Sequence, residues 1–251
     1  MKLTFLGSGN AGGVPLFGCD CPACERATLS AAYRRHSACL LIEADDSVIL
    51  LDAGLPELAT QPFMDRVTKV VLTHYHTDHV QGLFRIRWGT GKHVPVIGPD
   101  DPEGCGDLLK HPGILDFGNK ATAFEPFTVG EVRLTPLPLT HSKPTFGYLI
   151  EHAGLTVAYL CDTVGLPDAT AERLQDQTLA AVIIDCSFPP RDAAPRNHND
   201  LTRALATIES LKSPRNLLTH IGHELDSWLM EHDHRLPDEV TVAYDGLVIE
   251  I

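Results

Sequence analysis

Four side chains able to bind a metal ion lie within the segment 74–79, HYHTDH. In an extended chain, residues two apart point the same way, so His74 and His76 can meet one ion. Asp78 and His79 fall where the chain turns and can face a second ion. A polar surface turn, or a histidine buried in the core, would explain one such residue. Four at this spacing predict a metal site.

Three further candidate ligands each follow an apolar run, and they are His141, Asp162 and His220. Strands laid side by side bring such ends to one edge, where rigid elements hold ligands in position. Two cations about 3.5–4 Å apart lower the pKa of a water between them and clamp the oxygens of a displacement reaction. We therefore predict seven ligands in two groups: His74, His76 and His141 for one ion, Asp78, His79 and His220 for the other, and Asp162 bridging both.

A cysteine cluster in the short loop 18–25 predicts a second kind of metal site. Cys19, Cys21 and Cys24 offer three thiols, whereas structural zinc takes four nitrogen or sulfur ligands. Small buried thiols or a redox pair are the alternatives, but three cysteines within six residues favour zinc. The fourth ligand must come from elsewhere, and the candidates by residue type are a histidine, Cys39, Cys105 or Cys186.

The elements that must position these residues are many and short. Segment 169–179 follows Pro167-Asp168 and segment 201–211 follows Asn199-Asp200, so both predict helices that begin at polar residues. Segment 99–130 is rich in glycine and proline and receives no assignment. Many strands with few helices favour sheets packed face to face with helices outside, in one domain over 1–251. Apolar runs predict strands at 3–6, 38–43, 48–51, 69–73, 94–97, 132–135, 146–151, 156–160, 181–184, 216–219, 240–243 and 247–251.

The composition narrows the classes of function. Among 251 residues, 20 Lys+Arg against 33 Asp+Glu give a charge of −13, which argues against broad binding to nucleic acid or an anionic membrane. No run approaches the roughly 18 apolar residues of a membrane helix. The first residues break into glycines too soon for a signal peptide. Together with seven cysteines, an odd number, this predicts a reducing, cytoplasmic compartment.

The pattern His-x-His-x-Asp-His, followed by a later His, Asp and His, resembles the metallo-β-lactamase superfamily of binuclear hydrolases. The resemblance covers nearly the whole chain and implies an α/β (α+β) fold, an αββα sandwich with the site at one edge. Residues 50–54, LLDAG, look like the early aspartate turn of that family. Asp52 would then hydrogen-bond to a ligand such as His76, the alternative being a polar turn residue. Oxygen-reducing di-iron members carry Glu where this chain has His76, so the chain looks hydrolytic.

Within the superfamily, the chain resembles the cyclic-phosphate phosphodiesterases of the bacterial carbon–phosphorus lyase pathway. That resemblance implies His223 as the fourth ligand of a structural Zn²⁺, two active-site Mn²⁺ ions and a homodimer. It also implies conversion of 5-phospho-α-D-ribose 1,2-cyclic phosphate to ribose 1,5-bisphosphate in phosphonate catabolism, with 2′,3′-cyclic nucleotides as further substrates. Zinc, iron or nickel also suit His/Asp ligands. The shared segments are 9–15, 88–89, 111–113, 141–143, 185–187, 195–198 and 219–223.

A phosphodiester also needs a proton donor for its departing oxygen. His198 lies just before the predicted helix 201–211 and is the candidate, although an exposed loop histidine fits the residues equally well. The resemblance implies that His198 is a catalytic acid beside the catalytic ligand Asp78. A second phosphate would want cations, for which Lys143, Arg191 and Arg196 are candidates. The other histidines are interpreted as structural or exposed, and they are His36, His93, His111, His152, His232 and His234.

Two other functions remain open from the sequence. One is a thioester or lactam hydrolase of the same fold, and the other is a zinc-stabilised binding module without catalysis. The acidic charge and the lack of a long basic arm disfavour RNA as a substrate. The sequence therefore predicts a small phosphorylated sugar as the partner, and neither nucleic acid nor a membrane.

Overall fold

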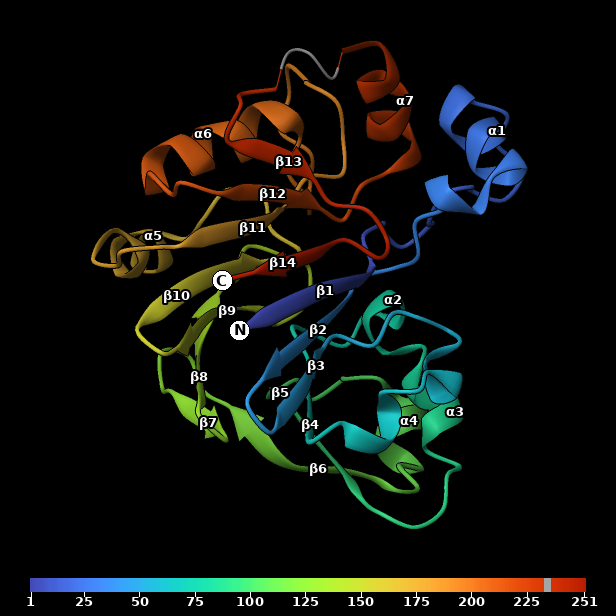
Figure 1. Cartoon of the computed structure of the whole chain (residues 1–251), viewed down its shortest axis with the longest axis vertical. Helices are drawn as coiled ribbons and strands as arrows, with labels where there is room; N and C mark the ends of the chain where they lie inside the picture. The colour runs from blue at the N-terminus through green and yellow to red at the C-terminus, as the bar shows by residue number, and fades with distance from the viewer. Residues whose placement is uncertain (233–235) are drawn as a thin grey trace.

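The chain completes most of one β-sheet before it begins another, as the computed structural model shows (Figure 1). The structure describes residues 1–232 and 236–251, so His234 lies outside the described residues. Within them, two seven-stranded sheets pack face to face, and helices cover their outer faces. This αββα sandwich confirms the predicted fold class. Among the described helices, none combines the length and apolar character that crossing a bilayer requires.

The first sheet has the strand order β14-β1-β2-β3-β4-β5-β6. Its central strands β3 to β6 run parallel, which brings their carboxyl ends to the same edge. Its strands are β1 (Lys2–Gly7), β2 (Cys39–Ala44), β3 (Ser47–Leu51), β4 (Lys69–Val71), β5 (Val94–Pro99), β6 (Leu115–Ala121) and β14 (Val248–Glu250). Its outer face packs against α2 (Thr77–Val80), α3 (Leu83–Ile86), α4 (Gly106–Lys110) and the 3₁₀ turns Leu58–Thr60 and Met64–Arg66.

The second sheet has the order β13-β12-β11-β10-β9-β8-β7, and its strands β10 to β13 are parallel. They are β7 (Phe127–Val129), β8 (Val132–Pro138), β9 (Phe146–His152), β10 (Leu155–Leu160), β11 (Ala181–Asp185), β12 (Asn216–Thr219) and β13 (Val240–Val242). Helices α5 (Asp168–Gln175), α6 (Leu201–Leu211) and α7 (His223–His232) cover its outer face. A further helix, α1 (Pro22–Leu29), and the 3₁₀ turn Ala31–Tyr33 lie beside α7.

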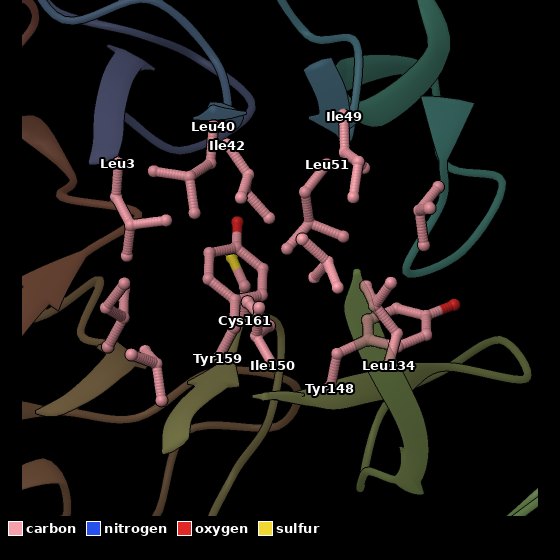
Figure 2. Packing of buried hydrophobic residues seen from close by; sticks show 14 of the residues in the cluster. Leu3, Leu40, Ile42, Ile49, Leu51, Leu134, Tyr148, Ile150, Tyr159 and Cys161 are labelled. Atoms are coloured by element: carbon pink, nitrogen blue, oxygen red, sulfur yellow. The ribbon is translucent and has the colours of Figure 1, made fainter. Parts of the chain in front are cut away.

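The main core lies between the two sheets (Figure 2). Leu40 and Ile42 of β2 point from one sheet toward Ile150 and Tyr159 of the other. Because side chains alternate across a strand, the intervening residues pack under the outer helices, as Leu41 does. Both faces are therefore apolar, which explains why the strands read as continuous runs of Val, Ile and Leu.

Every predicted strand overlaps a strand of the structure, and helix 201–211 has the predicted bounds. Asp200 caps that helix by accepting a hydrogen bond from the backbone N of Arg203 at 2.9 Å. The helix predicted over 169–179 ends at Gln175, because the backbone N of Ala180 already bonds to the oxygen of Thr156 as the chain enters β11. The unassigned segment 99–130 holds α4, β6 and β7.

Candidate metal centre

The predicted ligands all stand just beyond strand ends. Segment 74–79 follows β4, and its one-turn helix α2 carries Asp78 and His79. His141, Asp162 and His220 follow β8, β10 and β12. The structure brings these seven side chains together in two groups that share Asp162, with the ligand atoms of each group within 4.8 Å of one another. The grouping is the one that the sequence predicted.

The first group consists of three imidazoles and one carboxylate. His76 Nδ1 lies 2.8 Å from His74 Nε2 and 3.0 Å from His141 Nε2. Asp162 Oδ2 lies 3.6 Å from each of those two Nε2 atoms. Ligands at about 2.0–2.1 Å from one tetrahedral ion would lie about 3.4 Å apart, so the group fits a single divalent cation. Burial lowers the pKa of all three histidines, and that favours the neutral imidazole that a metal needs.

The second group contains two carboxylates and two imidazoles. His79 Nε2 lies 3.4 Å from Asp78 Oδ2 and 3.3 Å from Asp162 Oδ2. His220 Nε2 lies 3.5 Å from Asp78 Oδ2 and 3.3 Å from Asp162 Oδ1. Within the described part of the chain, the Nε2 atoms of both histidines are buried without a hydrogen-bond partner. A cation between these four groups would satisfy both nitrogens, so the residues fit a second metal ion.

The carboxylates of the second group are ionised and attract a cation to the site. Burial would raise the pKa of Asp162 and of Asp78, but the neighbouring His79 and His220 outweigh it and hold both pKa values well below the usual range. Burial would likewise lower the pKa of His79, yet Asp162, Asp52 and Asp78 together raise it. The pocket therefore holds ionised carboxylates in a dry setting, where a divalent cation is strongly attracted.

Four of the five imidazoles are held from behind through Nδ1, which leaves Nε2 to face the cluster. Such outer hydrogen bonds fix the ring orientation and the tautomer of metal-binding histidines. The partners are Thr73 Oγ1 for His74 at 3.0 Å, Asp52 Oδ2 for His79 at 2.8 Å, the Asn197 carbonyl for His141 at 3.0 Å, and Ser187 Oγ for His220 at 2.9 Å.

Asp52 supports a different ligand from the one named in the sequence prediction. It contacts His79 rather than His76. Strands β3 and β4 pair in parallel with Leu51 opposite Val71, and this register sets Asp52 beside the backbone N of Thr73, at 2.8 Å. Asp52, Asp162 and His220 all have positive φ, at 60°, 65° and 59°. Strained backbone therefore occurs at three site residues that follow strand ends.

His198 lies against both groups and is held by a buried aspartate that the sequence analysis did not identify. Its ring stacks on His220, with centroids 4.7 Å apart. Its Nδ1 lies 2.9 Å from Oδ2 of Asp185. Burial would lower the pKa of His198, but the Asp185 carboxylate outweighs it and raises the pKa to about 9, so the ring carries a proton at neutral pH. Asp185 also follows an apolar strand run, the signal that identified the other site residues.

Two of the three candidate cations for a second phosphate are paired with carboxylates. Lys143 Nζ lies 3.1 Å from Asp101 Oδ2, and Arg191 pairs with Glu224. Arg196 is exposed and has no ion-pair partner among residues 1–232 and 236–251. Of the three candidates, Arg196 is therefore the most available to bind a phosphate.

The structure also brings Cys19, Cys21 and Cys24 together with His223, within 4.8 Å of one another. His223 Nδ1 lies 3.4 Å from the sulfur of Cys19 and 3.5 Å from that of Cys21. Hydrogen bonds from Ser227 and His223, among others, outweigh the effect of burial and lower the pKa of Cys21 to about 6, which favours the thiolate that zinc binds. Because His223 begins α7, an ion here would tie the cysteine loop and α1 to α7.

These features place the chain in a family. The model of the beta-lactamase superfamily domain matches residues 48–221, and the chain belongs to this superfamily. Its match to a solved structure described as a new diphosphatase from the PhnP family has a TM-score of 0.81 and 27% identity, and covers 100% of this chain and 97% of the other. PhnP is the cyclic-phosphate phosphodiesterase of the carbon–phosphorus lyase pathway, so this match confirms the resemblance noted from the sequence.

Two curated relatives are longer than this chain. An octanoyltransferase of Porphyromonas gingivalis is 28% identical over 264 residues, which cover 98% of this chain and 51% of that protein. The mitochondrial ribonuclease Z 2 of Schizosaccharomyces pombe is 23% identical over 249 residues, which cover 86% of this chain and 36% of that protein. The chain thus spans about half or less of these relatives.

Proposed function

We propose that this protein is a binuclear-metal phosphodiesterase that opens a small cyclic phosphate, and that its substrate is 5-phospho-α-D-ribose 1,2-cyclic phosphate. The product is ribose 1,5-bisphosphate, an intermediate of phosphonate catabolism. The observation that carries the proposal is the pair of ligand groups sharing Asp162, with His198 stacked on His220 and held by Asp185. The likeness to a diphosphatase supports hydrolysis at phosphorus.

The residues divide the work between binding and proton transfer. When bound, two divalent cations activate a water and neutralise charge on the phosphoryl oxygens. Asp185 holds His198 Nδ1, so that Nε2 carries the proton for the leaving group. As water adds to phosphorus, the bond from phosphorus to the 2-oxygen of ribose breaks, and that oxygen takes the proton of His198. The phosphate remains on the 1-oxygen.

The metals and partners belong to the same proposal. We assign two Mn²⁺ ions to the His/Asp groups, whose donors also suit zinc, iron or nickel, and one Zn²⁺ to the cysteine group. The partner is a small phosphorylated sugar in the cytoplasm, with no nucleic acid or membrane, and the protein is a homodimer. The charge of −13 supports a small ester over a long RNA.

Several other activities compete with this proposal. The ribonuclease Z relative makes RNA the second candidate, and a 2′,3′-cyclic nucleotide lies between the two in size. Acyl transfer ranks lower, because the chain spans about half of the octanoyltransferase and a site with two cations suits phosphoryl oxygens. A thioester or lactam hydrolase of the same fold also ranks below the diesterase.

Phosphorus NMR of the manganese-loaded protein with the cyclic ribosyl phosphate tests the proposal. We expect the cyclic signal to be replaced by one new monoester signal beside that of the 5-phosphate, and the coupling of the new signal to the ribose protons identifies the bond that breaks. A parallel panel contains a 2′,3′-cyclic nucleotide, a short RNA, a glutathione thioester and a lactam. Turnover of the RNA, thioester or lactam without the cyclic diester would overturn the proposal. No turnover of any substrate by fully metal-loaded protein would favour a zinc-stabilised binding module.

A further inference from the structure

A cavity of about 450 Å³ lies between the α1 region and α7. Its walls come from α1, from residues 32–35 that follow it, from α7, and from residues 242 and 244 near β13. The described residues that line it include none of the candidate metal ligands or His198. Its volume falls within the roughly 300–1,000 Å³ of small-molecule sites. The cavity therefore differs from the site assigned to phosphodiester hydrolysis.

The charged residues of this cavity favour an anion. Arg26, Arg34 and Arg35 line it against one carboxylate, Asp226, an excess of two positive charges (3 − 1) in a chain of charge −13. Asp226 is shared between Nη2 of Arg26 at 3.3 Å and Nη2 of Arg35 at 3.0 Å. Within the described residues, the Nε atoms of both arginines are buried and have no hydrogen-bond partner. The side chain of Arg35 is only 10% exposed. The charge excess of these three guanidinium groups over Asp226 is therefore what favours an anion in the cavity.

The remaining walls suit a flat or apolar group. Tyr33, Met230 and Tyr244 line the cavity and are each between 42% and 50% exposed. The guanidinium of Arg26 lies over the Tyr33 ring, 4.3 Å from its centroid, so one wall is already charged and aromatic together. A ligand that carries a phosphate at one end and an aromatic group at the other would match both parts.

We propose that this cavity binds an organic phosphate of the size of a nucleoside monophosphate. Its phosphate pairs with Arg26 and Arg34, and its base packs among Tyr33, Met230 and Tyr244. The proposal is independent of the reaction at the metal centre, because it assigns a separate binding site.

Hydrogen bonds and helix α7 connect the cavity to the His/Asp metal centre and to the cysteine site. Arg35 Nη1 donates to Ser8 Oγ at 3.1 Å, and the backbone carbonyl of Ser8 accepts a hydrogen bond from the backbone N of Ile221 at 2.9 Å. Ile221 directly follows the candidate ligand His220. Asp226 lies one turn beyond His223 on α7. A ligand here braces α1 against α7 and stabilises the cysteine loop.

Isothermal titration of the metal-loaded full chain with AMP tests the proposal, with adenosine and inorganic phosphate as the two partial probes. We expect AMP to bind at least tenfold more tightly than either. Arg34→Gln and Arg26→Gln should each weaken AMP binding at least about tenfold, the loss of a charge-assisted hydrogen bond. Arg66→Gln, which removes a surface charge on the other sheet, is the matched control and should leave the affinity unchanged.

Binding of AMP at the metal centre is distinguished by His76→Ala, which removes a candidate ligand. Retained affinity in that variant supports the cavity, whereas lost affinity would overturn the proposal. Equal affinities for AMP and adenosine, or for AMP and inorganic phosphate, would also overturn it. So would unchanged AMP binding in the arginine variants. Zinc content and melting temperature check that these variants are folded, and Arg34 is the safer position because its side chain bonds only to the Ala27 carbonyl among the hydrogen bonds of the described residues.

Discussion

Two stacked histidines at the metal centre, His198 and His220, face different groups through their Nδ1 atoms. His198 Nδ1 faces the carboxylate of Asp185, whereas His220 Nδ1 faces the hydroxyl of Ser187. The Asp185 carboxylate outweighs burial and raises the pKa of His198, while the Nε2 of His220, which has no hydrogen-bond partner among the described residues, points toward Asp78 and Asp162. These surroundings support the proposal that His198 gives a proton and that His220 binds a cation.

Replacing His198 with Ala tests the first of these roles. We expect kcat on the cyclic diester to fall about 10²–10⁴-fold, because the leaving oxygen loses its proton donor. Metal content by mass spectrometry should match wild type, since His198 belongs to neither predicted ligand group. His93→Ala, at an exposed histidine, is the matched control. Unchanged turnover in His198→Ala would remove this residue from the mechanism.

The Asp185→Asn variant separates positioning from binding. Asp185 is fully buried and also accepts hydrogen bonds from the backbone N of Thr163 at 3.0 Å and from Ser187 Oγ at 3.1 Å. We expect kcat to fall about 10–100-fold with KM nearly unchanged, because the amide holds the His198 ring less firmly. The measurement is a full kinetic curve together with metal content. An increase in KM at constant kcat would show that Asp185 serves substrate binding instead.

At the scale of the element, α1 and the cysteine loop have little core of their own. Their buried cluster consists of Val14, Ala23, Cys24 and Ala27, and ion pairs from Arg26 and Arg35 to Asp226 complete the contact with α7. A cluster this small stabilises a helix weakly, because the area buried is small. A zinc ion bound by the cysteines and His223 would supply the missing cross-link.

Replacing Cys21 with Ser should remove that cross-link. We expect one equivalent of zinc to be lost and the melting temperature to fall by roughly 5 °C or more, at about 2–4 °C per kcal/mol for a chain of this size. The two catalytic metals should be partly retained. The control is Cys105→Ser, outside the cysteine group. Zinc content equal to wild type would refute the structural site.

Among the described elements, the sequence predicted every strand except β6 and β7, but it missed the helices α1, α2, α3, α4 and α7. Runs such as 181–184 are buried on both faces and so are continuously apolar, which makes them visible. The one-turn helices α2 and α3 are too short to show a helical period, and the last turn of the expected helix 169–179 is replaced by the chain entering β11. Contacts with distant parts of the chain set such boundaries, and the local sequence does not show them.

The grouping of the site residues followed from one rule, that ligands stand beyond strand ends. The same rule applies to Asp185, but its partner His198 depends on how the loop after β11 folds back. The partner of Asp52 likewise depends on the register of β3 against β4. Residue types and strand ends can therefore be predicted from the chain, whereas contacts between loops need the structure.

At the scale of the whole molecule, the candidate metal centre joins two halves of the chain. His74, His76, Asp78 and His79 come from the first sheet, and His141, Asp162 and His220 come from the second. A bound cation therefore links the sheets at the edge where their strand ends meet. Without a cation, burying the ionised carboxylate of Asp162 costs folding free energy, and a bound cation would offset this cost.

Metal removal should consequently destabilise the fold. After chelation, titration with Mn²⁺ should raise the melting temperature in proportion to the logarithm of the metal concentration. At a Mn²⁺ concentration of 100 times Kd, the free energy of unfolding should increase by about 2.7 kcal/mol. That corresponds to roughly 5–11 °C. Scanning calorimetry of wild type and Cys21→Ser in parallel separates this effect from that of the cysteine site. A melting temperature that is insensitive to Mn²⁺ would contradict the link between the sheets.

Residues near the two ends of the sequence are also joined, and this contact predicts how stability depends on pH. Asp245 accepts hydrogen bonds from Ser8 and lies 2.7 Å from His36 Nδ1. The hydrogen bond to Asp245 raises the pKa of His36 above 6.5. The folded state therefore binds this proton more tightly than the unfolded state does, so the stabilisation is complete below about pH 6.5 and is lost as pH rises through the folded pKa. Because His36 is 43% exposed, solvent screens the effect and it should be small.

Urea unfolding of wild type and His36→Gln at pH 6.0 and pH 8.5 measures this contribution. We expect the difference in unfolding free energy between the two proteins to be larger at pH 6.0, where His36 carries its proton, than at pH 8.5. Comparing two proteins at each pH cancels the effect of pH on metal binding, which both share. The Arg66→Gln variant should show the same difference at both pH values, because hydrogen bonds from Lys2 and Arg66 lower the pKa of Glu43 and keep its carboxylate ionised at both. If His36→Gln and wild type differ equally at both, the proton on His36 contributes nothing to the contact between the chain ends.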